Sequence, residues 1–168
     1  MPEVAEDLRR AIEPAQLRQL LGCFPTGVAV ITTCTPDRQP AGLTCNSFSS
    51  VSLDPPLVLF SLRNASRLLP TFQAATGFAI NILSQQQDAL SGRFASSKIE
   101  DKFDGVAWRA GRLGMPLIDD CLASFECRMH AAHEAGDHTI VVLKVTAITV
   151  HDVPPIVFHR STFRRLGA

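Results

Sequence analysis

The sequence predicts a mainly β protein, a single-domain β-barrel with a few flanking helices. The chain has 168 residues, of which 46% are hydrophobic, and this is enough for one domain with a sizeable core. Stretches rich in β-branched residues alternate with turn residues, whereas helical patterns are sparse. The second half lacks the regular strand–helix alternation of a doubly wound sheet. We expect one domain over residues 14–168, preceded by an N-terminal extension over residues 1–13.

Helical spacing appears in three places. Apolar residues at i, i+3, i+4 and i+7 predict a helix over Pro14–Phe24, with one face formed by Leu17, Leu20, Leu21 and Phe24. Ser66 is a suitable cap for a short helix over 66–75. Ser84, with Gln87 three residues later, resembles a capping box and predicts a helix that runs to about residue 94.

Strands are expected where β-branched and apolar residues gather between turn residues. Pro36–Arg38 and Asp54–Pro56 supply two of these turns. In chain order the expected strands are Gly27–Thr35, Gly42–Phe48 (a polar strand or strand–loop), Leu57–Leu62, Gly77–Leu83, Ala123–Ala131, His138–Val150 and Ile156–Phe158.

The clearest β signal is a late hairpin. Apolar and polar residues alternate from Ala123 to Ala131, and Gly136-Asp137 suits a two-residue turn before His138–Val150. Strict alternation makes this last strand apolar on both sides, with Ile140, Val142, Ile148 and Val150 on one and Val141, Leu143, Val145 and Ala147 on the other. Both faces of such a strand must be buried, one by the core of the domain and the other by a further surface. We expect a second subunit to supply that surface.

Composition excludes several classes of function. Lys plus Arg and Asp plus Glu each number 16, so the chain lacks the basic excess of a nucleic-acid binder or of a protein that binds anionic membranes. No apolar run approaches the roughly 20 residues of a membrane span, and the charged N-terminus does not resemble a secretory signal. Five cysteines without a C-x-x-C pair indicate reduced thiols, so we expect a cytoplasmic protein.

The sequence does not favour a metal or a classical nucleotide fold. His130 and His133 are three residues apart on an expected strand, so they point to opposite faces and converge poorly on one ion. No G-x-G-x-x-G follows a strand, and no P-loop motif is present. We therefore expect no metal, and any nucleotide must bind by another route.

Polar side chains gather in three other places. One is the stretch Ala41–Ser50, where Thr44, Asn46 and Ser47 offer hydrogen-bond donors and acceptors. Ser66-Arg67 lies before a possible helix and suits a phosphate, and a basic group follows at Arg93, Lys98 and Lys102. From composition alone, a solvated loop, a capping serine and a solvated helix end also explain these features. A lone histidine such as His138, directly after a turn, is by default a surface residue.

Five segments together resemble one family, the short-chain flavin reductases, which are the reductase components of two-component flavin-dependent monooxygenases. The segments are FPTGVAVITT (24–33), GLTCNSFSSVSLDPPLVLFSL (42–62), SGRFASSKIEDKF (91–103), GDHTIVVLKV (136–145) and IVFHRSTFRRL (156–166). Their order and spacing are those of the family, and the resemblance as a whole covers roughly Leu17–Leu166, nearly the whole chain.

The resemblance implies an FMN-binding split β-barrel, a Greek-key barrel that forms a homodimer. His138 would be the catalytic residue and would face the nicotinamide, while Phe158 and Arg160 would help to hold the nicotinamide nucleotide. The complete set of cofactor-binding residues that the resemblance implies is Pro40, Ala41, Gly42, Leu43, Thr44, Asn46, Ser47, Ser61, Leu62, Arg63, Ser66, Arg67, Arg93, Phe94, Lys102, Phe158 and Arg160.

The function that the resemblance implies is that of an NAD(P)H:flavin oxidoreductase. Such an enzyme reduces FAD or FMN by hydride transfer from NADH or NADPH and supplies diffusible reduced flavin to a partner monooxygenase. The tail departs from the family at His159 and Ser161, and Leu143-Lys144 replaces the Gly and acidic residue that are common there. The alternative is a non-enzymatic flavin-binding or electron-transfer protein of the same fold.

Overall fold

The structure, a computed structural model, describes residues 12–166. Of the expected N-terminal extension over residues 1–13, only Ile12 and Glu13 fall within this range, and the expectation for residues 1–11 lies outside the described residues. No helix in the described range is long and apolar enough to cross a membrane.

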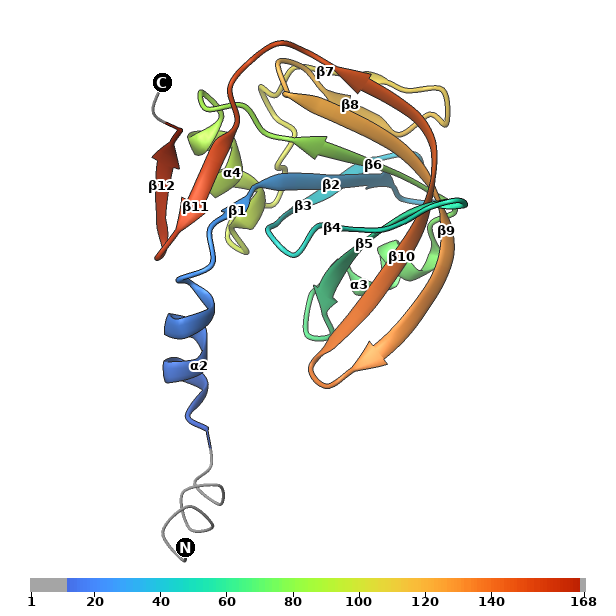
Figure 1. Cartoon of the computed structure of the whole chain (residues 1–168). Coiled ribbons are helices and arrows are strands. Elements are labelled where there is room, and N and C mark those ends of the chain that lie inside the picture. The colour runs from blue at the N-terminus through green and yellow to red at the C-terminus, as the bar shows by residue number, and fades with distance from the viewer. Residues whose placement is uncertain (1–11, 167–168) are drawn as a thin grey trace, which may run out of the picture.

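An antiparallel seven-stranded sheet dominates the fold, in the order β3-β2-β6-β9-β10-β5-β4, and confirms the mainly β prediction. Figure 1 shows that this sheet curls around a central core. The two edge strands follow one another in the chain, and the described residues form no ladder between them, so the barrel is split at this point. The bounds are β2 Ala29–Cys34, β3 Pro40–Cys45, β4 Ser49–Leu53, β5 Pro56–Arg63, β6 Gly77–Ile82, β9 Ala123–Ala135 and β10 His138–Val150.

Three phenylalanine rings fill the centre of the curled sheet. Phe60, Phe72 and Phe78 are each at most 1% exposed, and their ring centroids lie 5.8 to 6.4 Å apart. Phe72 comes from the short helix α3 (Leu69–Ala74), which covers this core. Burial of each ring contributes about 1.5–3 kcal/mol, so the aromatic trio is a principal stabiliser of the barrel.

A second core lies between the sheet and helix α4 (Asp88–Ala95). Here Phe94 packs edge-on against Phe103, with the ring centroids 5.0 Å apart. The buried Asn81 amide joins the neighbouring strands, because it donates to the Val30 carbonyl at 3.2 Å and accepts from the Ile118 amide at 3.0 Å. The second bond fixes a small hairpin of β7 (Trp108–Ala110) and β8 (Pro116–Ile118) against the barrel.

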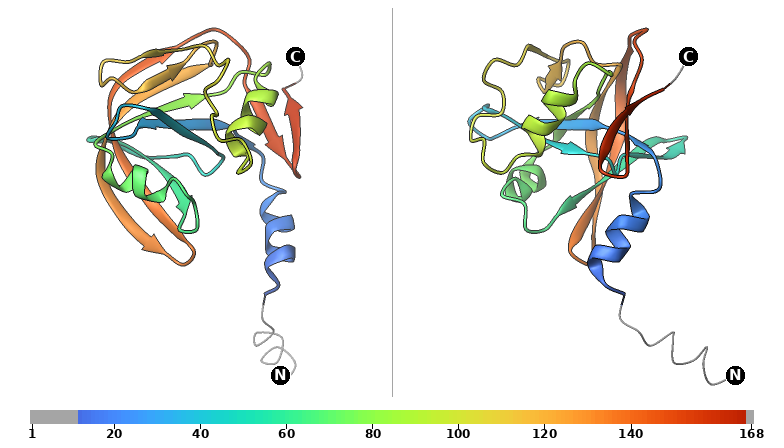
Figure 2. Two further views of the ribbon diagram at one scale, coloured as in Figure 1. Left: turned by 180° about the vertical axis from the view of Figure 1, so that it is seen from behind. Right: turned by 90° about the vertical axis from the view of Figure 1, so that its left-hand side faces the viewer.

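A three-stranded sheet stands beside the barrel, in the order β1-β11-β12. Its strands are β1 Thr26–Gly27, β11 Ile156–His159 and β12 Thr162–Arg165. The turn between β11 and β12 is bound to the end of the first helix, because the Arg160 amide donates to the Gly22 carbonyl at 2.8 Å. Figure 2 shows this sheet next to the chain that leads out of that helix toward β1.

The first helix, α2 (Pro14–Leu21), is shorter than the expected Pro14–Phe24. Phe24 precedes a proline, where helical backbone is disfavoured, and residues 22–24 continue in tighter turns. No residue of α2 is buried, and the helix projects away from the barrel in Figure 1. Its predicted apolar face is therefore uncovered: the exposed fractions of Leu20 and Leu21 are 62% and 65%.

The predicted β9–β10 hairpin is confirmed, with β10 at the expected bounds and Gly136 at a φ of 63° in the turn. The expected division of β10 into two faces is wrong beyond Val145. Val145 pairs with Cys127 and Ala147 pairs with Glu126, so a bulge at Thr146 moves all later residues to the opposite face. As a result Ile148 and Val150 lie on the same face of the strand as Val145, which faces the core. They are nevertheless 71% and 75% exposed, because this end of β10 extends past the core.

Other expected elements differ in their bounds. The 66–75 helix starts only at Leu69, and the Ser66 hydroxyl accepts the Leu68 amide in the turn before it. Gln87 accepts the Ser84 amide at 3.0 Å, but helix α4 begins after this turn. Strands β4, β7, β8 and β12 were not predicted, since they are short and, in β7 and β12, wholly exposed.

Candidate active site

The turn between β3 and β4 is the centre of the candidate site, because it crosses the split in the barrel. Thr44, near the end of β3, donates its hydroxyl to the Ser91 carbonyl of α4 at 2.6 Å. Ser47, in the turn, accepts the Ser61 amide of β5 at 2.8 Å. Asn46 lies between them and is exposed. The fold thus anchors this polar turn on both sides and leaves the Asn46 amide facing outward.

The end of β5 supplies the next part of the site. Leu62 is in the core, whereas Arg63 is exposed and pairs across the ladder with His138, the first residue of β10. The chain then turns, with the Ser66 amide donating to the Arg63 carbonyl at 2.9 Å, and Arg67 follows as an exposed cation. Two guanidinium groups and a histidine therefore lie at or just beyond one end of the β5–β10 ladder.

His138 is held by residues of its own hairpin and by the neighbouring turn. Its Nδ1 atom is 2.7 Å from the Oδ1 atom of Asp137, and this hydrogen bond and the histidine charge lower the pKa of Asp137. The Asn64 amide donates to the Asp137 carbonyl at 2.9 Å, and the Thr139 hydroxyl donates to the Asn64 side chain at 2.8 Å. The imidazole is thus oriented through Nδ1, which leaves Nε2 for a ligand.

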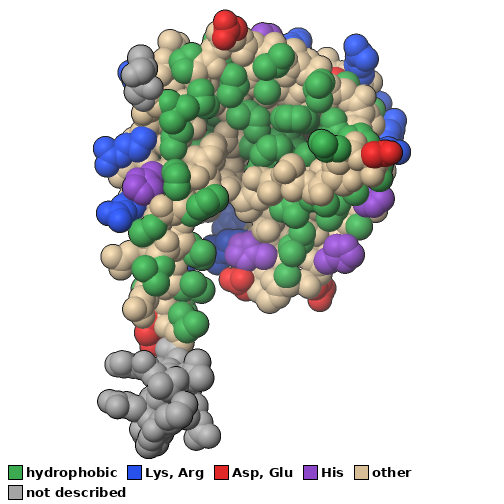
Figure 3. Space-filling view, viewed as in Figure 1, with side chains coloured by type: hydrophobic (Ala, Val, Ile, Leu, Met, Phe, Trp, Pro, Cys, Tyr) green, Lys and Arg blue, Asp and Glu red, His purple; other side chains and the backbone are tan. Residues whose placement is uncertain are grey.

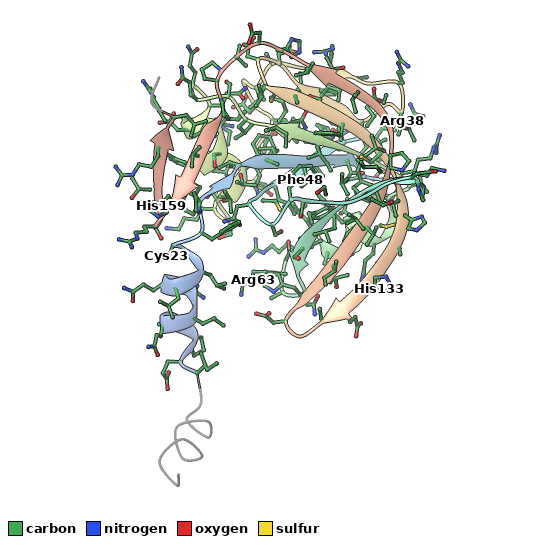
Figure 4. The ribbon with its side chains drawn as sticks, in the orientation of Figure 1. Cys23, Arg38, Phe48, Arg63, His133 and His159 are labelled. Atoms are coloured by element: carbon green, nitrogen blue, oxygen red, sulfur yellow. The ribbon has the colours of Figure 1, made fainter. Side chains whose placement is uncertain are left out.

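The space in front of these residues is open. Figure 3 shows a notch between the column of α2 and the barrel, with Lys or Arg side chains at its back and a histidine at its barrel edge. Figure 4 shows that Arg63 leaves the barrel on the side that faces α2. The structure therefore brings together, of the implied residues, Asn46, Ser47, Ser61, Arg63, Ser66, Arg67 and His138 around one end of the barrel split.

Gly42 and Phe94 meet on the face of β3 that also carries Thr44 and that packs against helix α4. A Cβ atom at Gly42 would be only 2.9 Å from the Cε1 atom of Phe94, so only glycine permits this close approach. Phe94 itself is 1% exposed and belongs to the second core. Its side chain supports β3 from behind, and its contact with a cofactor stays a prediction, as do those of Pro40, Ala41 and Leu43.

Arg93 and Lys102 connect helix α4 to the loop that follows it by hydrogen bonds to backbone carbonyls. Arg93 donates to the Asp104 carbonyl at 2.9 Å, and Lys102 donates to the Phe94 carbonyl at 2.8 Å. Partial burial lowers the pKa of Lys102. In this structure the two cations close the loop over the helix C-terminus, where positive charge is favourable. Their expected contact with a phosphate is untested.

Phe158 and Arg160 belong to the small sheet rather than to the barrel edge. Phe158 pairs with Thr26 on β1 and packs against the second core. Arg160 and Ser161 both have positive φ, at 48° and 59°, in the turn that contacts Gly22. Phe158 and Arg160 therefore lie in the small sheet, next to the end of α2. Their expected role in holding the nicotinamide nucleotide stays a prediction.

The donor set suits a flavin and a nicotinamide nucleotide. The exposed Asn46 amide and the exposed guanidinium groups of Arg63 and Arg67 lie at this end of the barrel, and such groups bind ring carbonyls and phosphates. The hydroxyl of Thr26, beside Phe158, is buried and has no hydrogen-bond partner among the described residues.

Three residues near the site, Thr26, Asp137 and Asn64, were not predicted from the sequence. Only Asp137 had a recognisable signal there, its position next to His138.

Other chemistry finds no support in the described range. No three His, Cys, Asp or Glu side chains converge there on a point that could hold a metal ion. All five cysteines are free thiols, and burial raises the pKa of Cys121 and of Cys127 to about 12. These thiols are therefore poor nucleophiles at neutral pH.

A split barrel with polar donors at its open end defines a class of protein that binds a planar, anionic cofactor at the barrel edge. The chain belongs to the flavin reductase like domain family, whose model matches residues 21–167.

Relatives of known name support this assignment over most of the chain. FMN reductase (NADH) SmoA of Agrobacterium fabrum is 49% identical over 150 residues, which cover 89% of this chain and 84% of that protein. HsaB, a flavin-dependent monooxygenase reductase subunit of Mycobacterium tuberculosis, is 40% identical over 157 residues, 90% of this chain and 82% of that one. For three further relatives, the match covers only between 43% and 58% of their length.

A solved structure shows the same fold. The NADH:FAD oxidoreductase SgcE6 of Streptomyces globisporus C-1027, in complex with NAD and FAD fragments, superposes with a TM-score of 0.87. It is 37% identical, and the match covers 94% of this chain and 97% of that one. The expected split β-barrel fold is thereby confirmed.

Proposed function

We propose that this chain is an NAD(P)H:flavin oxidoreductase that reduces FAD or FMN and supplies diffusible reduced flavin to a partner monooxygenase. The observation that carries the proposal is the meeting of the Asn46 turn with the Arg63–His138 pair at one end of the barrel split. Membership of the flavin reductase like family, and relatives named as reductases of monooxygenases, support the same conclusion.

Each part of the site has a distinct role in this proposal. The β3 backbone and the turn at Asn46 and Ser47 hold the isoalloxazine ring, and Ser66 and Arg67 bind the flavin phosphate. His138 orients the nicotinamide through Nε2, since Nδ1 is engaged by Asp137. Phe158 and Arg160 help to hold the rest of the nicotinamide nucleotide.

The bound flavin supplies the chemistry, because it accepts a hydride from the nicotinamide. The protein needs no side chain as an acid or base in that step, so its contribution is to place the two rings face to face. Arg63 and the amide groups of the turn favour the negative charge of a reduced flavin. The open notch of Figure 3 allows the product to leave by diffusion.

The proposed activity is tested with the purified, unaltered chain. Purified chain is mixed with each pairing of NADH or NADPH with excess free FAD or FMN, and the loss of nicotinamide absorbance is followed. Flavin-dependent consumption with at least one pairing is expected. If no pairing consumed the nicotinamide nucleotide, the proposed enzyme activity would be contradicted. Flavin that stays tightly bound and coloured without such consumption would support the alternative, a flavin-binding or electron-transfer protein.

A homodimer belongs to the same proposal. Apolar side chains gather on the face shown in Figure 3, over the α2 column and over the front of the barrel. Leu20 and Leu21 on α2 and Ile148 and Val150 on β10 are all more than 60% exposed. A second copy that covers both surfaces would bury them in one symmetric interface. Five free thiols in such an assembly are consistent with a cytoplasmic location.

A further inference from the structure

We infer that Cys45 is a positioning residue for the flavin-binding turn, because its thiol fixes the Ser47 hydroxyl that ties this turn to β5. The inference rests on the proposed function and adds to it a residue for which neither the sequence motifs nor the relatives suggested a role. Cys45 is the last residue of β3 and is 6% exposed, with its side chain in the barrel core.

The thiol makes two contacts with the turn. The Sγ atom of Cys45 accepts the backbone amide of Ser47 at 3.3 Å and lies 3.0 Å from the Ser47 hydroxyl oxygen. A side-chain acceptor that binds the amide two residues on is the arrangement by which Asp, Asn, Ser and Thr build turns. Here a buried sulfur atom serves the same purpose, and the turn bends around it.

The proton of the Ser47 hydroxyl is then used within the protein. Its oxygen accepts the Ser61 amide at 2.8 Å, and its single proton goes to the Cys45 sulfur at 3.0 Å or to the Ser61 carbonyl at 3.4 Å. A hydroxyl has only one proton to donate. Ser47 therefore has no hydroxyl proton left to donate to a flavin, and it acts through its backbone and through the position it gives Asn46.

This hydrogen-bonded chain spans the split in the barrel. Cys45 ends one edge strand, Ser47 lies in the crossing, and Ser61 belongs to β5, which also carries Arg63. A shift of the Ser47 hydroxyl therefore moves the turn relative to Arg63 and His138. Loss of the thiol should consequently weaken flavin binding and leave the nicotinamide side intact.

The test compares Cys45→Ala, which removes the acceptor, with Cys45→Ser, which keeps one. Flavin binding is measured by quenching of flavin fluorescence on titration, and KM values for flavin and NADH are measured separately. Cys45→Ala is expected to weaken flavin binding by about 2- to 10-fold, the range for one net hydrogen bond, with KM for NADH unchanged. Cys45→Ser is expected to restore most of the affinity.

Two controls separate positioning from loss of packing. Cys127→Ala removes a thiol from the same core at 0% exposure, away from the turn, and should leave flavin affinity unchanged. In the double variant Cys45→Ala/Ser47→Ala, the loss of flavin affinity should be smaller than the two single losses combined, because the contact between the thiol and the Ser47 hydroxyl is common to both variants. The inference would be overturned if Cys45→Ser or Cys127→Ala lost as much flavin affinity as Cys45→Ala. It would also be overturned if Cys45→Ala impaired the KM for flavin and the KM for NADH equally.

Failure of the proposed function would be recognised separately, in the unaltered chain. If it consumes no nicotinamide nucleotide, the enzyme is contradicted, and the fluorescence titration of the same variants still decides the role of Cys45. Unaltered chain that binds no flavin would overturn both.

Discussion

The Nδ1 atom of His138 lies 2.7 Å from a carboxylate oxygen of Asp137. His138 is the first residue of β10 and pairs with Arg63 of β5. The contact with Asp137 fixes the ring at the edge of the notch. Replacement of His138 with Ala should raise KM for NADH about 2- to 10-fold, since one net hydrogen bond is worth about 0.5–1.5 kcal/mol. Flavin affinity, measured by fluorescence quenching, should change little. Asp137→Asn should give a smaller effect in the same direction, and equal losses for both cofactors would contradict the role.

The same contact predicts the direction of a titration. The hydrogen bond from His138, followed by its charge, lowers the pKa of Asp137 from the ordinary 3.8. A lowered pKa means that any stability from this contact is present above the unfolded-state pKa and is lost as the pH falls through the folded one. An NMR titration of the Asp137 carboxyl carbon should show a midpoint below 3.8, and His138→Ala should move it upward. An unmoved midpoint would show that the contact is absent in solution.

Gly42 predicts a destabilising substitution. A Cβ atom there would be 2.9 Å from Phe94 and 3.2 Å from the Ile31 carbonyl oxygen, and neither group can move freely. Gly42→Ala should lower the free energy of unfolding by about 1–3 kcal/mol, the usual cost of overpacking. Gly92→Ala is the matched control, because nothing lies within 4 Å of its Cβ position and alanine favours its helix. Urea denaturation measures both, and equal effects would contradict the close approach of β3 to Phe94.

The turn between β11 and β12 predicts a stabilising substitution. Arg160 and Ser161 both have positive φ, where non-glycine residues carry a cost of about 1–2 kcal/mol each. Ser161→Gly should therefore raise the free energy of unfolding by about 1 kcal/mol, seen as a higher thermal midpoint. Thr162→Gly, one residue later on β12, should have the opposite effect. A lower midpoint for Ser161→Gly would argue against this turn geometry.

The uncovered face of α2 predicts separation of subunits without unfolding. Leu20 and Leu21 are more than 60% exposed, and no residue of α2 is buried within its own chain. The double variant Leu20→Glu/Leu21→Glu should therefore keep the circular dichroism spectrum and thermal midpoint of the folded barrel. In sedimentation analysis the unaltered chain should be a dimer and the variant a monomer, whereas Gln19→Glu on the same helix should remain dimeric. A dimeric double variant would place the interface elsewhere.

Local patterns made the β9–β10 hairpin predictable, because alternation and a glycine at the turn lie within one short stretch. The bulge at Thr146 was not predictable in this way, since a bulge is a property of two strands paired together. The exposed strands β7 and β12 carry no burial pattern and so gave no signal. The early end of α2 follows from the proline after Phe24, a restriction that apolar spacing alone overlooks.

The candidate site was predictable in its residue types but only partly in its contacts. Asn46 and Ser47 stood out because polar residues interrupt an apolar stretch, whereas the Arg63–His138 pairing depends on strands far apart in the chain. Arg93 and Lys102 were recognisable as cations, but their carbonyl partners come from the folded loop. The thiol of Cys45 gave no signal, because a buried cysteine in a strand resembles any other small apolar residue.

The central claim is tested most directly by anaerobic reduction of flavin in large molar excess over the chain. NADH or NADPH is added, and the visible absorbance of the flavin is followed. The account predicts bleaching of many equivalents of flavin per chain, because each reduced flavin leaves the open notch and another takes its place. Bleaching of no more than one equivalent, or of none with either nucleotide, would contradict it.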